Sequence, residues 1–164
     1  MYIFDPKSPI RIKKILPNVK LIFLLRNPIE RAFSHYSSIR KRGLESLSFE
    51  NAIKMEEERL EGEYEKMLEN QNYYSKKFHF YGYLAGGHYY KLLKNWFTEF
   101  EKKQILIIKS ENMFKNPSIE LKKICSFLGI SNINLDTYNQ YNLWESKLDQ
   151  DNHKKLKEYF NPHN

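Results

Sequence analysis

The chain has 164 residues, a length that suits one domain with a single core, and its 41% hydrophobic and 15% aromatic content excludes a disordered protein. No apolar run reaches the roughly 20 residues that a membrane helix needs, and no signal-peptide pattern opens the chain, so we expect a cytoplasmic protein. The net charge of +7 suits an anionic partner such as a nucleotide or an acidic glycan, and would equally suit weak nucleic-acid binding.

Residues 1–18 contain three prolines and several basic side chains, and we expect a loop with some extended character there. Residues 19–25 then form a nearly continuous apolar run, typical of a parallel strand that is covered on both faces. Asn27 suits a helix cap and Pro28 suits the first helical position. The sequence therefore predicts a strand, a short turn and a helix, whose apolar stripe consists of Ile29, Ala32, Phe33 and Tyr36.

Arg26 ends this predicted strand, at the edge of a parallel sheet where ligands usually bind. Its planar guanidinium suits a phosphate, and we expect free N–H groups at the helix start to add to the site. Ser34 lies about 10 Å along the helix from Asn27 at 1.5 Å per residue, so a serine and a long arginine could hold one phosphate between them. The residues alone leave open that Arg26 pairs with a neighbour and that Ser34 is simply solvated.

The segment LLRNPIERAFSHY resembles the part of sulfotransferases that holds the 3′-phosphate of 3′-phosphoadenosine 5′-phosphosulfate (PAPS). In that family an arginine ends a strand and a serine eight positions later completes the clamp, and Arg26 and Ser34 occupy these two positions. The resemblance is closer to the bacterial and heparan-sulfate-type glycan branch than to the small-phenol branch. It implies a PAPS-dependent enzyme that transfers a sulfuryl group to a hydroxyl or amine, on a carbohydrate or another acceptor.

A second stretch, residues 82–111, predicts a helix and then a short strand, and it resembles the same family. Helix followed by strand implies a right-handed crossover and thus a parallel sheet. Tyr83 and Tyr89 could line the nucleotide or acceptor site, although aromatic packing is the simpler interpretation. The positions that match the family mostly support the fold, and they are Gly87, Tyr89, Leu93, Trp96, Phe100, Ile105 to Ile108, Ser110 and Glu111.

Three further helices are expected. We expect residues 48–69 to form one helix whose many glutamates are solvated and not a catalytic pair, because nothing in the sequence buries a carboxylate or raises its pKa. Residues 70–81 show no clear period. Pro117 begins a helix that ends at Gly129 and whose apolar stripe includes the single cysteine, Cys125, as a buried inert thiol. The last helix covers residues 151–160, and its buried side is predicted to include His153, Leu156, Tyr159 and Phe160.

The resemblance also implies parts that we do not find before Val19. Sulfotransferase domains begin with a strand, a loop with lysine and glycine, and a helix, which hold the 5′-phosphosulfate, and a Glu or His there takes the acceptor proton. Gly86 and Gly87 come too late and lack a preceding strand, whereas Lys147 is a weak candidate for a loop that closes over the nucleotide.

We therefore expect residues 1–164 to form a single α/β domain with the three-layer, P-loop-like sulfotransferase fold, a parallel sheet and no N-terminal strand, loop and helix. Such a truncated domain would be inactive alone, would leave one sheet edge uncovered, and could be completed by a separate chain. Other interpretations stay open. One is a non-catalytic nucleotide- or polyanion-binding remnant of the same fold. A P-loop kinase relative needs a glycine-rich loop ending in Lys-Ser/Thr, and a nucleic-acid binder needs a motif, and the sequence has neither.

Overall fold

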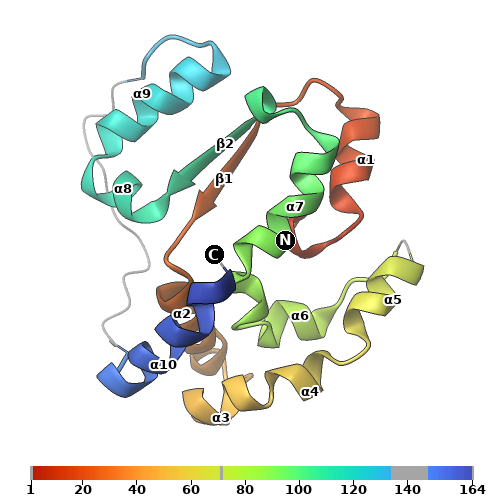
Figure 1. Cartoon of the computed structure of the whole chain (residues 1–164), viewed down its shortest axis with the longest axis vertical. Coiled ribbons are helices and arrows are strands. Elements are labelled where there is room, and N and C mark those ends of the chain that lie inside the picture. The colour runs from red at the N-terminus through yellow and green to blue at the C-terminus, as the bar shows by residue number, and fades with distance from the viewer. Residues whose placement is uncertain (1, 71, 134–147, 164) are drawn as a thin grey trace.

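The computed structural model describes residues 2–70, 72–133 and 148–163, and within them two parallel strands form a small sheet (Figure 1). The strands β1 (Leu21–Leu25) and β2 (Ile105–Lys109) pair in register, with Leu21 opposite Ile105 and Leu25 opposite Lys109. The crossover between them ends with α7 (Tyr89–Glu99), as a parallel pair requires a long connection. The predicted α/β class and parallel sheet are confirmed.

Helices lie on both sides of this sheet (Figure 1). On one side α7 packs beside α1 (Ser8–Ile15), and Trp96 of α7 meets Phe23 of β1 edge to face with ring centroids 5.2 Å apart. On the other side lie α8 (Ser110–Lys115) and α9 (Pro117–Leu128). As predicted, α9 buries Cys125 and ends at a glycine in the left-handed conformation, Gly129.

Apart from the side chains packed on the sheet, a separate apolar cluster surrounds α2 (Pro28–Lys41), the helix that follows the carboxyl end of β1. The predicted cap is confirmed, since the Asn27 side-chain oxygen accepts the Ile29 N–H at 3.0 Å. Beside α2 lies α10 (Gln150–Phe160). The buried residues that join these helices include Ile29, Ala32, Tyr36, Ile39, Tyr83, Leu156 and Phe160. Four residues were predicted on or near the buried side of α10. Leu156 and Phe160 are buried there and Tyr159 packs its ring on His88 and Phe160, whereas the prediction is wrong for His153, which is exposed.

The expected loop at the N-terminus is wrong, because α1 occupies residues 8–15, after a short 3-10 turn at Tyr2–Phe4. Pro9 lies in the first turn of α1, where a missing N–H breaks no intrahelical bond, and Pro17 lies two residues beyond the last residue, Ile15. The Ser8 hydroxyl donates to Asp5 at 2.8 Å and steadies the start of the helix. The prolines that we took for breaks therefore mark the two ends of a helix.

The single helix predicted over residues 48–69 is also wrong. The chain forms α3 (Phe49–Lys54), α4 (Glu56–Leu60) and α5 (Glu63–Glu69). The break before α5 falls at Gly62, whose φ of 69° is accessible to glycine at little cost. Residues 70–81, for which no element was predicted, contain α6 (Lys76–Tyr81), capped by the Ser75 hydroxyl.

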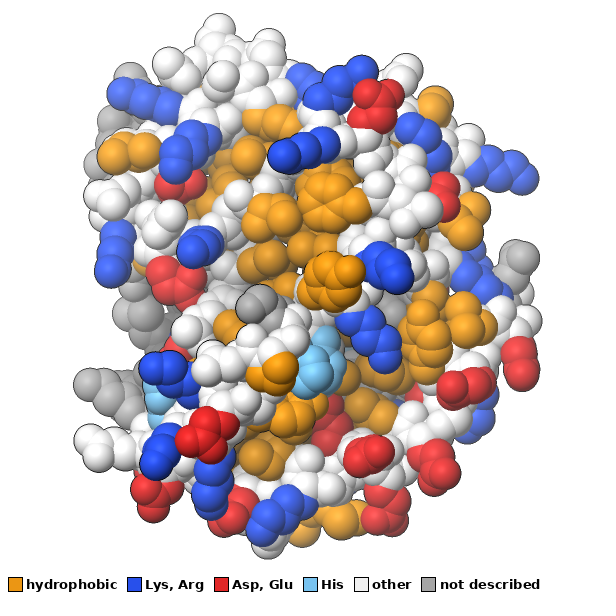
Figure 2. Space-filling view, in the orientation of Figure 1, with side chains coloured by type: hydrophobic (Ala, Val, Ile, Leu, Met, Phe, Trp, Pro, Cys, Tyr) orange, Lys and Arg blue, Asp and Glu red, His pale blue; other side chains and the backbone are white. Residues whose placement is uncertain are grey.

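The strands are only partly covered by the described residues. Parallel strands are normally buried on both faces, but Ile22, Leu24 and Ile107 are 39%, 53% and 43% exposed. Figure 2 shows that apolar side chains gather in the middle of this face of the molecule, over the strands and α7. None of the described helices is long and apolar enough to cross a membrane.

Candidate functional site

The predicted site lies where the two strands end. Arg26 follows β1, and Glu111, in the first turn of α8, follows β2. Because the strands are parallel, these two residues lie at the same edge of the sheet, and the Glu111 carboxylate accepts the Asn27 N–H at 2.7 Å. Tyr89, the first residue of α7, donates its hydroxyl to the Arg26 carbonyl oxygen, also at 2.7 Å. Three elements therefore meet at the turn between β1 and α2.

The Arg26 side chain is accessible to a ligand. It is 38% exposed, and its guanidinium lies 3.7 Å from the carboxylate of Glu30, which is 46% exposed. The pairing of Arg26 with a neighbour, which the sequence left open, is thus present in a loose and solvated form. Exposed pairs of this kind contribute about 0–1 kcal/mol, so the guanidinium can leave its partner for a phosphate.

Ser34 is partly exposed on the same helix. Glu30 and Ser34 are one helical turn apart and therefore neighbours on α2, which places the Glu30 carboxylate between the two residues of the predicted clamp. The expected free N–H groups at the helix start are largely absent. The Asn27 N–H is bound by Glu111, Pro28 has none, and the Ile29 N–H is bound by the cap. The candidate phosphate contacts are therefore the side chains of Arg26 and Ser34.

Arg31 lies on the same helix, and its charge acts on both Tyr89 and Glu56. Its guanidinium donates to the carbonyl oxygens of Gly82 and Tyr83, and burial lowers its pKa. A Cβ atom at Gly86 would lie 2.5 Å from the Arg31 guanidinium, and one at Gly87 would lie 2.7 Å from the Phe160 ring. The glycine pair therefore permits close packing against α2 and α10.

The remaining candidates from the sequence have structural roles or lie outside the described residues. Tyr83 is fully buried, packs edge to face on the rings of His35 and Tyr36, and donates its hydroxyl to Glu45 at 2.9 Å. Lys147 lies outside the described residues. Over residues 2–70, 72–133 and 148–163, no group of three or more His, Cys, Asp or Glu side chains could hold a metal ion.

The expectation that the acidic segment is entirely solvated is wrong. Glu56 is 4% exposed and Glu63 is 1% exposed. Burial raises the pKa of Glu56 to about 7, although the N–H groups of Leu84 and Ala85 each bind its carboxylate at 2.7 Å. A raised pKa often marks a catalytic group. Both oxygens of Glu56, however, accept backbone N–H groups, so Glu56 has a structural role and joins α4 to residues 84 and 85. Its place four residues after buried Ala52, on the apolar stripe of the helix, was the signal in the sequence.

Comparison with known proteins identifies this arrangement. Residues 6–162 match the model of the family described as "Sulfotransferase domain". A solved structure, a sulfotransferase from Alicyclobacillus acidocaldarius, superimposes with a TM-score of 0.76 at 27% sequence identity and covers 99% of this chain and 58% of its own.

Two curated relatives show similar levels of identity. The human heparan sulfate glucosamine 3-O-sulfotransferase 3B1 is 27% identical over 146 residues, which are 86% of this chain and 32% of that protein. The bifunctional heparan sulfate N-deacetylase/N-sulfotransferase 1 of Caenorhabditis elegans is 24% identical over 140 residues, which are 85% of this chain and 15% of that protein. The chain spans about a third or less of these relatives. Since the family match extends over nearly all of its residues, from α1 to α10, this chain belongs to the sulfotransferase domain family.

Proposed function

We propose that this chain binds the 3′-phosphate of PAPS with Arg26 and Ser34, and so contributes to the transfer of a sulfuryl group to a hydroxyl or amine of a carbohydrate. The observation that carries the proposal is the Arg26 side chain at the carboxyl edge of β1, which is 38% exposed and forms a loose pair with Glu30. The names of the relatives, which include heparan sulfate, support a carbohydrate acceptor.

The side chains present fit a phosphate. The guanidinium of Arg26 offers parallel N–H donors and a permanent positive charge, and the Ser34 hydroxyl offers one more donor. Glu30, nearly half exposed, must turn toward solvent when the phosphate approaches. PAPS, when bound, supplies the activated sulfuryl group, and these residues hold its nucleotide end in a fixed place.

The transfer step needs two further groups. A cation must stabilise the leaving phosphate oxygen, and a base must take the acceptor proton. We assign neither role to a described residue. We propose that a further polypeptide segment, in the same protein or in a separate chain, contributes both, in keeping with the 58% of the solved bacterial structure that this chain covers.

Calorimetric titration with 3′-phosphoadenosine 5′-phosphate tests the clamp. We expect Arg26→Ala to weaken binding by about 2 kcal/mol, or roughly 30-fold, because a charge-assisted hydrogen-bonded contact is lost. Arg11→Ala is a matched control, since Arg11 is 43% exposed and also lies 3.7 Å from a carboxylate, that of Asp5. The proposal fails if the two variants bind equally well, or if the wild-type chain does not distinguish this nucleotide from adenosine 5′-phosphate.

Tight but unspecific binding of both nucleotides would favour the alternative, a polyanion-binding module that carries out no transfer. The cytoplasmic location and the absence of nucleic-acid binding, both expected from the sequence, stay predictions.

A further inference from the structure

One peptide unit at the sheet edge is held at both of its polar ends. The carbonyl oxygen of Arg26 and the N–H of Asn27 belong to the same planar group. The Tyr89 hydroxyl donates to that oxygen at 2.7 Å, and the Glu111 carboxylate accepts that N–H at 2.7 Å. These two side chains come from α7 and α8, 63 and 84 residues further along the chain.

A peptide unit held in this way cannot rotate without breaking two hydrogen bonds. Its rotation would change ψ of Arg26 and φ of Asn27, the two angles that direct the chain from β1 into α2. On the helical side, the ring of Pro28 fixes the next φ and the Asn27 side chain is engaged as the cap. The path of the chain from β1 into α2, and with it the placement of Arg26 relative to Ser34 on that helix, is therefore held by Tyr89 and Glu111.

The two holding groups suit this task chemically. Tyr89 is partly buried, and burial raises its pKa, so its hydroxyl keeps the proton that it donates. Glu111 is partly exposed and offers the Asn27 N–H an acceptor oxygen at 2.7 Å. The charges of Arg31, Glu111 and Arg26 all act on the Tyr89 hydroxyl, so these groups lie around it.

We propose that Tyr89 and Glu111 are positioning residues of the phosphate site, which fix the Arg26–Asn27 peptide before the ligand arrives. Because the end of β1 and the start of α2 are already fixed relative to each other, Arg26 and Ser34 need less reordering when the ligand binds. This inference rests on the proposed function of Arg26, and it gives Tyr89 a task other than lining the nucleotide pocket.

The first experiment needs no ligand. Hydrogen exchange of the Asn27 amide is expected to be slow in the wild-type chain and in Glu111→Gln, which keeps an acceptor oxygen. In Glu111→Ala it should be faster by about tenfold or more, the effect of losing a hydrogen bond of about 1.4 kcal/mol. The Leu47 amide, which also binds a carboxylate, that of Glu45 at 3.0 Å, is the internal control. Equal exchange of Asn27 in all three proteins overturns the proposal.

The second experiment measures what the 3′-phosphate adds to affinity. The ratio of the dissociation constants of adenosine 5′-phosphate and 3′-phosphoadenosine 5′-phosphate should fall by about tenfold in Tyr89→Phe and Glu111→Ala. Glu111→Gln should keep the wild-type ratio. Tyr36→Phe is the matched control, because it removes a hydroxyl–carbonyl bond of 2.8 Å, to Leu47, far from the turn. A purely structural role would lower the melting temperature and leave this ratio unchanged.

Tyr89→Phe added to Arg26→Ala should have no further effect on the ratio, since Tyr89 acts through Arg26. A wild-type ratio near one overturns the proposed function, and the exchange of Asn27 then still decides whether the two side chains hold the peptide. A large wild-type ratio that survives both Tyr89→Phe and Glu111→Ala overturns the positioning role alone.

Discussion

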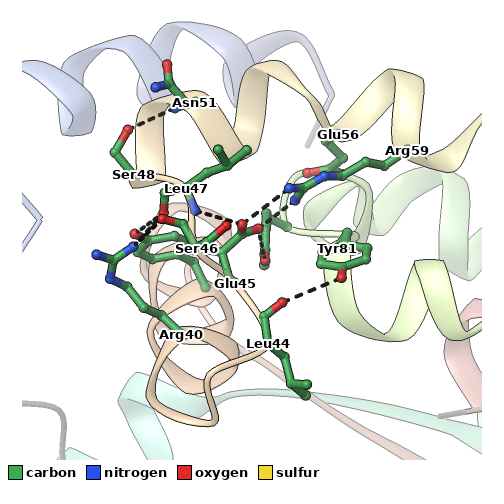
Figure 3. A network of polar contacts seen from close by, with 12 residues as sticks. Arg40, Leu44, Glu45, Ser46, Leu47, Ser48, Asn51, Glu56, Arg59 and Tyr81 are labelled. Atoms are coloured by element: carbon green, nitrogen blue, oxygen red, sulfur yellow. Dashed lines mark hydrogen bonds and ion pairs between the residues drawn. The ribbon is translucent and has the colours of Figure 1, made fainter.

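Charged side chains serve opposite purposes at the sheet edge and in the acidic segment of residues 45–69, which comprises a short loop and the helices α3 to α5. At the sheet edge, Arg26 and Glu30 are each more than a third exposed and 3.7 Å apart. In the acidic segment, the Glu45 side chain is 1% exposed and binds the Arg59 guanidinium, the Tyr83 hydroxyl and the Leu47 N–H (Figure 3). The first arrangement leaves an arginine available to a ligand, whereas the second uses both charges to join two parts of the fold.

Two buried glutamates within the acidic segment show what decides the charge of such a group. Burial alone would raise the pKa of both Glu56 and Glu63. For Glu63 the hydrogen bonds from Ser75, Tyr73 and Lys66 outweigh burial and lower the pKa to about 2. At Glu56 the backbone N–H groups and the charge of Arg31 also lower the pKa, but burial is the largest cause and raises it. Hydroxyl and ammonium donors outweigh burial at Glu63, whereas at Glu56 burial outweighs the backbone N–H groups.

The largest effect should follow from removing the buried carboxylate of Glu45. Glu45→Ala leaves the Arg59 guanidinium, a buried tyrosine hydroxyl and an N–H without their acceptor, and we expect a loss of about 4 kcal/mol in the free energy of unfolding. Urea denaturation measures it. Glu50→Ala is the control, because the pairs of Glu50 with Lys54 and Lys155 are exposed. Similar losses in both variants would show that a buried carboxylate stabilises the fold no more than an exposed one.

The pH dependence of stability should reveal Glu56. Its folded pKa of about 7 lies above the ordinary value of 4.5, so the folded chain holds a proton that the unfolded chain has released. The stabilisation is therefore complete below about pH 4.5 and is lost as the pH rises to about 7, by up to roughly 3 kcal/mol at 1.36 kcal/mol per unit. Burial lowers the pKa of His35 to about 4, which gives the opposite slope over part of this range.

The difference between the wild type and Glu56→Gln therefore isolates Glu56. We expect the glutamine variant to lack the fall in stability between pH 4.5 and 7 that the carboxyl group causes, as followed by urea denaturation at several pH values. Parallel pH profiles for the two proteins would show that Glu56 is charged at all these pH values, and that its pKa is not raised by burial.

The smallest effect is expected at the sheet edge. Glu30→Gln removes the carboxylate that competes with a phosphate for Arg26, and it should tighten binding of 3′-phosphoadenosine 5′-phosphate about two- to threefold, as an exposed pair contributes about 0.5 kcal/mol. Calorimetry at low and high salt measures it, and the gain should shrink as salt screens the pair. Weaker binding would instead mean that Glu30 orients Arg26.

The parts of the fold that could be predicted have complete local signals. The apolar run of β1, the cap at Asn27, the proline after it and the left-handed glycine at residue 129 each specify their element within a few residues. The start of the chain could not be read in the same way, since Pro9 and Pro17 flank a helix as readily as they interrupt one. The breaks near residues 55 and 62 lie in a stretch whose composition favours a continuous helix.

In the candidate site, too, local features could be predicted from the sequence and long-range contacts could not. Arg26 could be found from the sequence because its position follows directly from the end of a strand. The contacts of Tyr89 and Glu111 with the turn could not, since they join residues 63 and 84 positions apart. The burial of Glu56 likewise depends on N–H groups 28 and 29 residues away. Local periodicity shows which face of a helix is buried, but not which backbone groups will meet it there.

Cys125 gives this chain a built-in kinetic probe. It is the single cysteine of the sequence, it is 1% exposed, and it lies within α9 on one side of the sheet. A thiol reagent can reach it only when that helix opens or the whole chain unfolds, so the labelling rate reports the frequency of such openings. Comparing this rate with and without nucleotide would show whether a ligand at the carboxyl end of the strands slows the opening of α9. The measurement needs no engineered label.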